Sequence, residues 1–249
     1  MDLWRARDLV FGAGDRVRTW GRLVTGPDGD WLDVARVHDL IIRPPGWKSD
    51  RSIRLIGAEA VPTDVAPNGI RGHLSVVGIW RDESIEVEAQ RQERLPRESH
   101  PEWRDPLCPP PHGGWRHHVR DLDVDIDFGD LESSGAIVHR VIFRPSPDHE
   151  VLVVAATDVD AMKRQLSKHF PDQLCVVPSP FTCAQLDELR DVLRANWRDW
   201  RLESFGTGSD AQAQPFIMAQ PIQVTAEMAA WADTLPDGLL RLRPAISPV

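Results

Sequence analysis

The chain has 249 residues, of which 41% are hydrophobic and 27% are charged, and its net charge at pH 7 is −9. These proportions are typical of a soluble globular protein that is long enough for two domains. The apolar runs are far shorter than the roughly 20 residues of a transmembrane helix, and the N-terminus lacks the apolar core of a secretory signal. We therefore expect a cytoplasmic protein with no membrane partner.

The choice of basic residues indicates the source of the protein. Only three of the 29 basic residues are lysine, a bias that indicates a GC-rich bacterial genome.

The cysteines indicate how disulfides are used. Cys108, Cys175 and Cys183 are an odd number with no CxxC spacing, which argues against a disulfide framework. We expect Cys175 to be inert in an apolar strand. Cys183 stands where a strand meets a helix N-terminus, a place where a thiol pKa can be lowered, but a packing role is favoured.

Short strands separated by turns are predicted between residues 14 and 93. Residues 16–25 and 31–36 flank the turn GPDGD, and residues 72–80 and 85–93 flank the turn RDES. A further strand is predicted at residues 52–61. The N-terminal half is therefore expected to be rich in β structure, with two tight hairpins.

Five strands with a glycine inside the long first one resemble the OB-fold, a small five-stranded barrel. The residues that carry the resemblance are Val17, Trp20, Gly21, Leu23 and Trp31 in the first hairpin and Leu74, Val76, Gly78, Trp80, Ile85 and Val87 in the last. OB-folds often bind single-stranded nucleic acid with aromatic and basic side chains, so the resemblance implies a binding face. Its candidate residues are Trp20, Trp31, Trp80, Arg18, Arg22 and Arg54. Residues 1–94 hold 14 basic and 15 acidic side chains, however, and lack the net basic charge typical of such proteins.

The segment 95–134 is predicted to tether two domains, because its first part is dense in proline and glycine. The candidate ligands for zinc or iron within it are Cys108, His112 and His118. Cys108 and His112 could both reach a metal ion, but two ligands do not make a site. In residues 121–127 aspartates alternate with apolar residues, so a strand would place all the carboxylates on one face. Neighbouring carboxylates would lie about 6.5–7 Å apart, and a solvated acidic face is favoured over a calcium site.

The C-terminal part is predicted to have the order strand, helix, strand, strand, helix, strand over residues 174–246, which is the ferredoxin-like arrangement. A strand at 151–157 and a helix at 159–170 precede it and are expected to extend the sheet at its edge. The predicted fold class is therefore α+β. It combines an N-terminal five-stranded OB-like β-barrel over residues 1–94 with a C-terminal ferredoxin-like α/β sandwich over residues 135–249.

The sequence contains no pattern of a known catalytic class, such as GxSxG, HExxH, Walker A or GxGxxG. We therefore expect no cofactor and a non-catalytic protein-binding or assembly module, whose partner is another protein or a second copy of the chain. Single-stranded nucleic-acid binding through the barrel is one alternative. A metal-dependent enzyme at the segment Cys108–Asp130 is the other.

Overall fold

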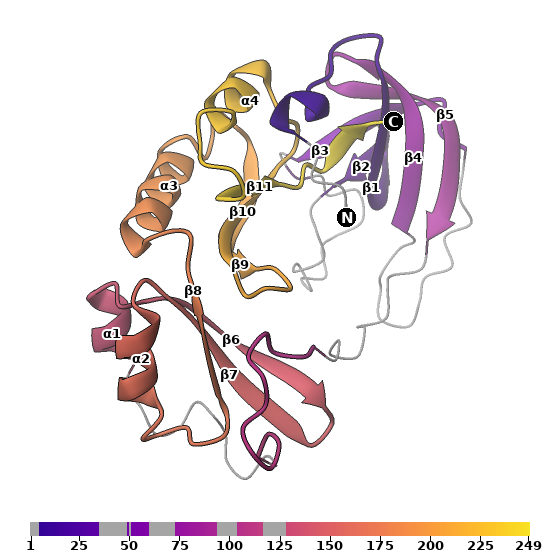
Figure 1. The fold of residues 1–249 in the computed structure, drawn as a ribbon. Helices are drawn as coiled ribbons and strands as arrows, with labels where there is room; N and C mark the ends of the chain where they lie inside the picture. The colour runs from indigo at the N-terminus through magenta and orange to yellow at the C-terminus, as the bar shows by residue number, and fades with distance from the viewer. Residues whose placement is uncertain (1–4, 35–48, 50, 60–72, 94–103, 117–127) are drawn as a thin grey trace.

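The structure is a computed structural model that describes residues 5–34, 49, 51–59, 73–93, 104–116 and 128–249 (Figure 1). It confirms the expected α+β class. The strands form one six-stranded sheet, which contains the N-terminal strands and the last strand of the chain, and two three-stranded sheets from the C-terminal half. Within the described residues no helix is both long and apolar enough to pass through a bilayer.

Five strands of the N-terminal half close into a ring. They are β1 (Arg16–Gly26), β2 (Gly29–Asp33), β3 (Ser52–Ile56), β4 (His73–Arg81) and β5 (Ser84–Glu93). Their order is β1-β2-β3-β5-β4, and β4 pairs back with β1; only the β3–β5 pair is parallel. Alternating apolar residues such as Val17, Leu32 and Leu74 are fully buried inside. The ring of five strands is thus confirmed, and its OB-like identity stays a resemblance.

Two glycines allow the strands of the ring to approach one another closely. A Cβ atom at Gly21 would lie 2.4 Å from the carbonyl oxygen of Asp33, and one at Gly78 would lie 2.2 Å from that of Glu86. No side chain fits at such distances, so only glycine lets the backbones come this near. Gly78 also stands at a register shift between β4 and β5.

The first sheet of the C-terminal half consists of β6 (Ile137–Ser146), β7 (His149–Ala156) and β8 (Leu174–Pro178), with β7 in the centre. Helix α2 (Val159–Leu166) connects β7 to β8, and these two strands are parallel. Helices α2 and α1 (Gly129–Ser133) lie on one face of this sheet, over an apolar cluster (Figure 1). The unit is therefore a βαβ crossover with one antiparallel strand, β6, added at its edge.

Residues 104–116 cover the opposite face of this sheet, where Trp115 packs against it. Cys108 in this segment forms a disulfide with Cys175 of β8. The expectation that the cysteines are not bridged is therefore wrong. The two residues are 67 positions apart in sequence, and only the folding of the segment over β8 brings their Cα atoms to 5.5 Å.

The second sheet of the C-terminal half has the order β9-β10-β11. Its strands are β9 (Leu202–Ser209), β10 (Pro215–Pro221) and β11 (Leu240–Leu242), and the helices beside it are α3 (Cys183–Ala195) and α4 (Ala226–Ala232). Apolar residues of both helices join those of the sheet in one buried cluster, which includes Leu189 and Met228.

In place of the expected single ferredoxin-like sheet, the strands of residues 174–246 are divided between sheets, because β8 pairs with β7 and not with β9, β10 or β11. Burial explains this difference. Residues 151–156 of β7 are all buried, as expected for a central strand that is covered on both faces. The last predicted strand, at 239–246, is also divided, and Pro244 lies between its two parts.

The two ends of the chain connect the halves of the molecule. After β11, the chain crosses to the barrel, where β12 (Ile246–Pro248) pairs antiparallel with β1. Figure 1 shows this yellow strand beside the indigo β1. The N-terminal 3-10 helix η1 (Ala6–Leu9) contributes Leu9 to a small cluster with Ala229 of α4. The barrel sheet therefore includes a strand from outside residues 1–94.

Candidate functional site

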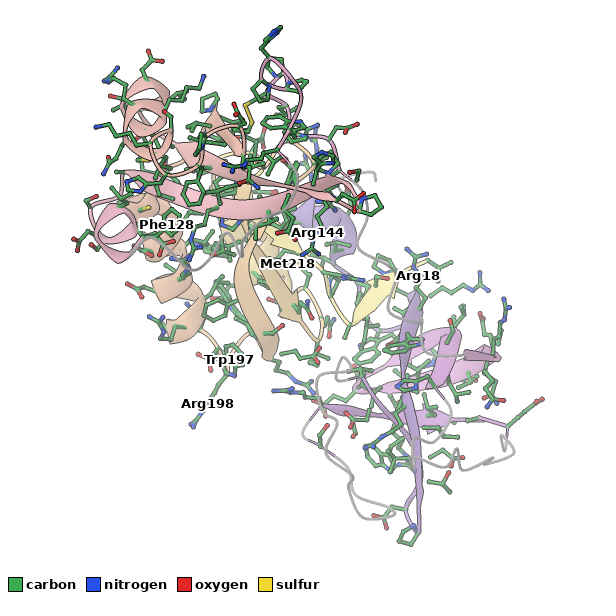
Figure 2. All side chains as sticks on the ribbon, turned by 90° about the horizontal axis from the view of Figure 1, so that it is seen from below. Arg18, Phe128, Arg144, Trp197, Arg198 and Met218 are labelled. Atoms are coloured by element: carbon green, nitrogen blue, oxygen red, sulfur yellow. A yellow bond between two sulfur atoms is a disulfide. The ribbon has the colours of Figure 1, made fainter. Side chains whose placement is uncertain are left out.

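Five of the six residues predicted for the barrel's binding face lie on its outer wall. Arg18, Trp20 and Arg22 alternate along β1 with residues that are buried. Trp31 on β2 and Arg54 on β3 are direct register partners, so they share one face of the wall. Arg18 donates to the hydroxyl of Ser247 at 3.2 Å, and Figure 2 shows it beside the C-terminal strand.

The side chains of this wall are engaged with one another. The ring of Trp20 stacks on His73, with the centroids 4.6 Å apart and the planes 12° from parallel. Arg22 is 3.5 Å from a carboxylate oxygen of Asp33, whose other oxygen accepts from Ser49 at 2.8 Å. Burial, and then the nearby Arg22 guanidinium, lower the pKa of His73 below its usual value. Arg22 and Trp20 of this face therefore already interact with other side chains of the protein, Asp33 and His73.

Trp80, the sixth predicted residue, lies in the barrel core with 6% of its surface exposed. Its ring meets the edge of Phe11 at a centroid distance of 5.5 Å. Alternation along β4 places Trp80 on the same inner face as Leu74 and Val76, so the prediction of a binding role is corrected to a packing role.

The candidate metal ligands are not brought together where the structure describes them. The Sγ atom of Cys108 is bonded to Cys175 and cannot act as a thiolate ligand in this state. His112 is exposed, while His118 and the acidic residues 121–127 lie outside the described residues. In the described part of the chain no group of three His, Cys, Asp or Glu side chains could hold an ion.

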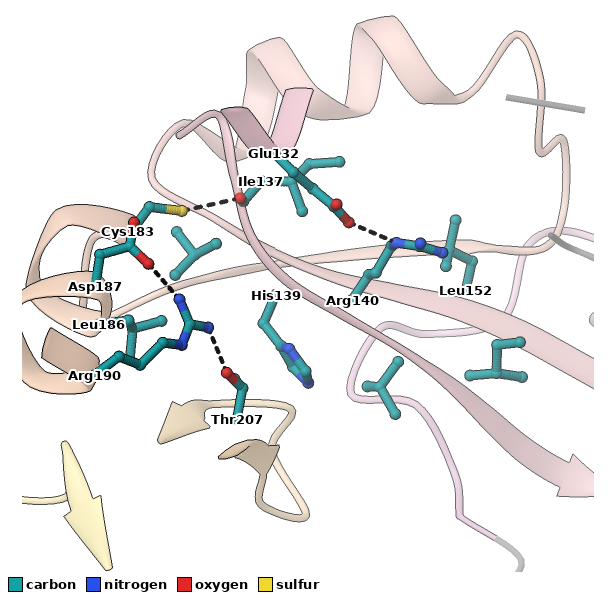
Figure 3. A pocket seen from close by; sticks show the side chains of 13 residues that line it. Glu132, Ile137, His139, Arg140, Leu152, Cys183, Leu186, Asp187, Arg190 and Thr207 are labelled. Atoms are coloured by element: carbon teal, nitrogen blue, oxygen red, sulfur yellow. Dashed lines mark hydrogen bonds and ion pairs between the residues drawn. The ribbon is translucent and has the colours of Figure 1, made fainter. Parts of the chain in front are cut away.

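A pocket of about 590 Å³ lies between β6, α3 and the edge of β9 (Figure 3). It is lined by Glu132, Ile137, Val138, His139, Arg140, Val141, Ile142, Leu152, Cys183, Leu186, Asp187, Arg190 and Thr207. Six of these residues are consecutive in β6. Its volume falls within the range of about 300–1,000 Å³ that is usual for ligand sites.

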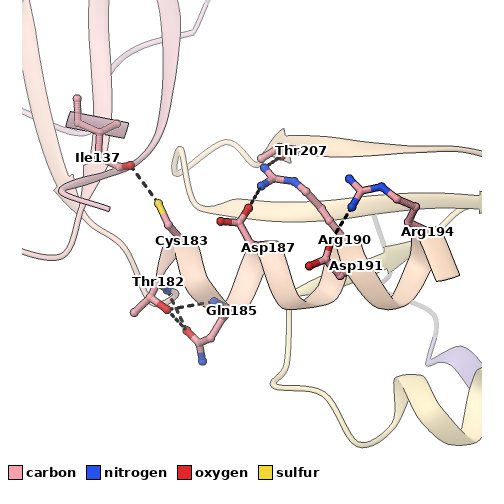
Figure 4. Close-up of polar contacts among 9 residues, drawn as sticks. All are labelled: Ile137, Thr182, Cys183, Gln185, Asp187, Arg190, Asp191, Arg194 and Thr207. Atoms are coloured by element: carbon pink, nitrogen blue, oxygen red, sulfur yellow. Dashed lines mark hydrogen bonds and ion pairs between the residues drawn. The ribbon is translucent and has the colours of Figure 1, made fainter. Parts of the chain in front are cut away.

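Local sequence signals place the α3 residues at the pocket. Thr182 caps the helix by accepting from the backbone N–H of Gln185, and the Gln185 side chain accepts from the Thr182 backbone N–H at 2.9 Å (Figure 4). The helix therefore begins at Cys183. Spacings of four and three residues then put Cys183, Asp187 and Arg190 on one face, which is directed to the pocket.

The charged groups of the pocket are paired. Arg140 of β6 donates to Glu132 of α1 at 2.7 Å, and its guanidinium lies 4.5 Å from the ring centroid of Phe128. Arg190 of α3 forms an ion pair with Asp187 and donates to the hydroxyl of Thr207 on β9. The Arg190 side chain therefore links α3 to β9 on one side of the pocket.

Cys183 and His139 both line the pocket, but they do not form a nucleophile and base. The Cys183 thiol donates to the carbonyl oxygen of Ile137 at 3.2 Å, and burial followed by the charge of Asp187 raises its pKa. The thiol therefore stays protonated, and the expectation of a packing role is favoured over a reactive one. Burial lowers the pKa of His139, as do Arg140 and Arg190. Its imidazole forms no hydrogen bond within the described residues.

Comparisons with protein-family models, with curated proteins and with solved structures found no match for this chain. The structure offers a preformed pocket with aliphatic walls and convergent polar groups, of which the sequence prediction had considered only Cys183. The enrichment of β-branched and aromatic residues in residues 137–143, IVHRVIF, is the signal that could have revealed the strand β6.

Proposed function

We propose that this chain is a non-catalytic protein-binding module that takes an extended segment of another protein along the edge of β6. In this mode of binding the segment adds one strand to the sheet. Its backbone hydrogen bonds to β6 provide affinity, and pockets for its side chains provide specificity. The run of six consecutive β6 residues around the pocket is the observation that carries it.

Consecutive residues of a strand point to opposite faces, so a pocket lined by all of them has to lie beside the strand's edge. Among the described strands β6 pairs only with β7, which leaves its other edge toward the pocket. At the far end of that edge the carbonyl oxygen of Arg144 accepts from the backbone N–H of Arg104 at 2.8 Å. By alternation, the backbone groups of Ile142 point to the same edge.

The accessible stretch of this edge is short. The carbonyl oxygen of Ile137 is bound by the thiol of Cys183, and that of Arg144 is bound by Arg104. The stretch from Ile137 to Ile142 measures about 20 Å, at about 3.3 Å per residue. Leu152 and Leu186 provide apolar walls on its two sides. The groove thus suits a short extended segment with an apolar side chain.

We test this with peptides and with a variant that fills the groove. Thr207→Trp places an indole in the pocket from β9, and Ser204→Trp is the matched control at an exposed position of the same strand. Peptides selected from a random heptapeptide library on the wild-type protein should bind the control and lose at least tenfold in affinity for Thr207→Trp. Equal affinities of the two folded variants would contradict the proposal.

The partner is either a different protein or a second copy of the chain, because a sheet edge accepts both. Sedimentation of the purified protein over a range of concentrations separates the two cases. A dimer that Thr207→Trp dissociates and Ser204→Trp leaves intact would identify the second copy.

Single-stranded nucleic-acid binding is the second candidate, favoured by the location of Arg18, Trp31 and Arg54 on the outer wall of the barrel. A labelled oligonucleotide titrated at low salt tests it. Arg54→Ala and Trp31→Ala should each weaken binding several-fold, with affinity falling as salt rises. No binding by the wild-type protein at low salt would exclude this candidate.

A further inference from the structure

We infer that the pocket beside β6 takes the C-terminal carboxylate of the partner's segment between His139 and Arg190. This inference rests on the proposed function, because it assumes that an extended segment lies along the β6 edge. It adds the chemical class of the group that ends the segment and a dependence of binding on pH.

Three cationic or cation-forming side chains converge on the pocket from two elements. His139 and Arg140 come from β6, and Arg190 comes from α3. Figure 3 shows the imidazole of His139 reaching into the space beside Arg190 and Thr207. Both guanidinium groups act electrostatically on His139. Each is paired with a carboxylate, Arg140 with Glu132 and Arg190 with Asp187, so the pocket offers an anion converging N–H donors and not a net positive charge.

Hydrogen-bonding capacity remains at this point of the pocket. The guanidinium of Arg190 has five N–H donors, and among the described residues it donates to Asp187 and Thr207. The imidazole of His139 makes no hydrogen bond within the described part of the chain. A carboxylate has two oxygens and can accept from both side chains at once.

The charge of the pocket is complementary to one carboxylate and one proton. Among the described residues, the ionised groups that face His139 are Arg140 on its own strand, Arg190 and Asp187 on α3, and Glu132 on α1. The two guanidinium groups balance the two carboxylates, and the neutral Cys183 thiol adds no charge. A bound carboxylate would leave one negative charge in excess. Protonation of His139 removes that excess, so binding takes up a proton.

The length of the edge favours a chain end over an internal acidic residue. At the two ends of the stretch a backbone carbonyl is already hydrogen-bonded, that of Ile137 by Cys183 and that of Arg144 by Arg104. An internal segment would have to pass both of these contacts, whereas a segment that ends inside the groove passes only one of them. A terminal carboxylate would then meet His139 and Arg190, which line the pocket together with Cys183.

The experiment compares three pools of random heptapeptides. The first pool has free C-terminal carboxylates, the second is amidated, and the third is amidated with glutamate at an internal position. Binding is measured by titration calorimetry between pH 6 and 8, where guanidinium and carboxyl side chains keep their charge. Two buffers with different ionisation enthalpies report the protons taken up.

We expect free carboxylates to bind at least tenfold more tightly than amides, with affinity that increases as the pH falls from 8 to 6 and with proton uptake on binding. His139→Gln should retain the fold and lose the pH dependence. If free and amidated peptides bind equally and Thr207→Trp still abolishes their binding, the inference of carboxylate recognition is overturned, while the proposal of binding along the β6 edge stands. If the pool with internal glutamate binds as tightly as the pool with free C-terminal carboxylates, the inference that the pocket takes a chain end is overturned. Binding by none of the pools would overturn both proposals.

Discussion

Reduction of the Cys108–Cys175 disulfide should destabilise the protein by a predictable amount. The bond closes a loop with a sequence separation of 67 residues. In the chain-entropy description, opening such a loop restores freedom to the unfolded chain that is equivalent to about 4 kcal/mol at 25 °C. With a urea dependence of about 3 kcal/mol per molar, the unfolding midpoint should fall by about 1.3 M.

The assay is urea unfolding followed by tryptophan fluorescence, with and without a dithiol reductant. A Cys183→Ala background removes the free thiol, which would otherwise exchange with the bridge. Cys175 is fully buried, so the reduced thiol stays in an apolar site and adds little of its own to the difference. Oxidised and reduced midpoints within 0.2 M of each other (about 0.6 kcal/mol at the same slope) would refute the reasoning. So would an intact mass with every thiol free in protein prepared without reductant.

Two further predictions concern the barrel. Gly78→Ala should lower the free energy of unfolding by about 2–3 kcal/mol, because its Cβ would meet the carbonyl oxygen of Glu86. Gly26→Ala, with no atom within 4 Å of its Cβ, should lower it by less than about 1 kcal/mol. Equal urea midpoints of the two variants would contradict the close approach of the strands. His73 has a lowered pKa in the folded state, because of burial and then Arg22, so the unfolded state takes up its proton first as the pH falls. Stability should therefore be lost from about pH 6.5 downward, and His73→Gln should weaken the difference between urea midpoints at pH 7.5 and 5.5; an unchanged difference would contradict this.

Local sequence patterns were sufficient to predict the ring of strands. Alternating apolar residues around the turns GPDGD and RDES predict both hairpins, and the predicted strand bounds lie within a few residues of the observed ones. The same alternation predicts that Trp80 points inward with Leu74 and Val76, so its placement was available from the sequence.

Pairing between distant segments could not be predicted in the same way. The run at 174–178 is an equally good partner for several strands, and its place beside β7 depends on burial of both faces of residues 151–156. The bridge between Cys108 and Cys175 depends in turn on that sheet, because residues 104–116 meet Cys175 only across its face. Such contacts are set by packing, which one sequence does not display.

The candidate site was the least predictable part, because it is assembled from four separate elements. Glu132, His139, Arg190 and Thr207 come from α1, β6, α3 and β9 in that order. Each of them reads in the sequence as an ordinary surface residue. Only the way in which α3 and β9 lie against the edge of β6 brings them together.

The most direct test is hydrogen exchange of the β6 backbone in the presence of a bound peptide. If a segment adds to this edge, the amide of Ile142 should exchange at least tenfold more slowly in the complex, because its N–H becomes bonded to the peptide. Amides of β12, which lies on the barrel, should not change. Peptide binding that leaves the exchange of the β6 amides unaltered would contradict the proposed edge.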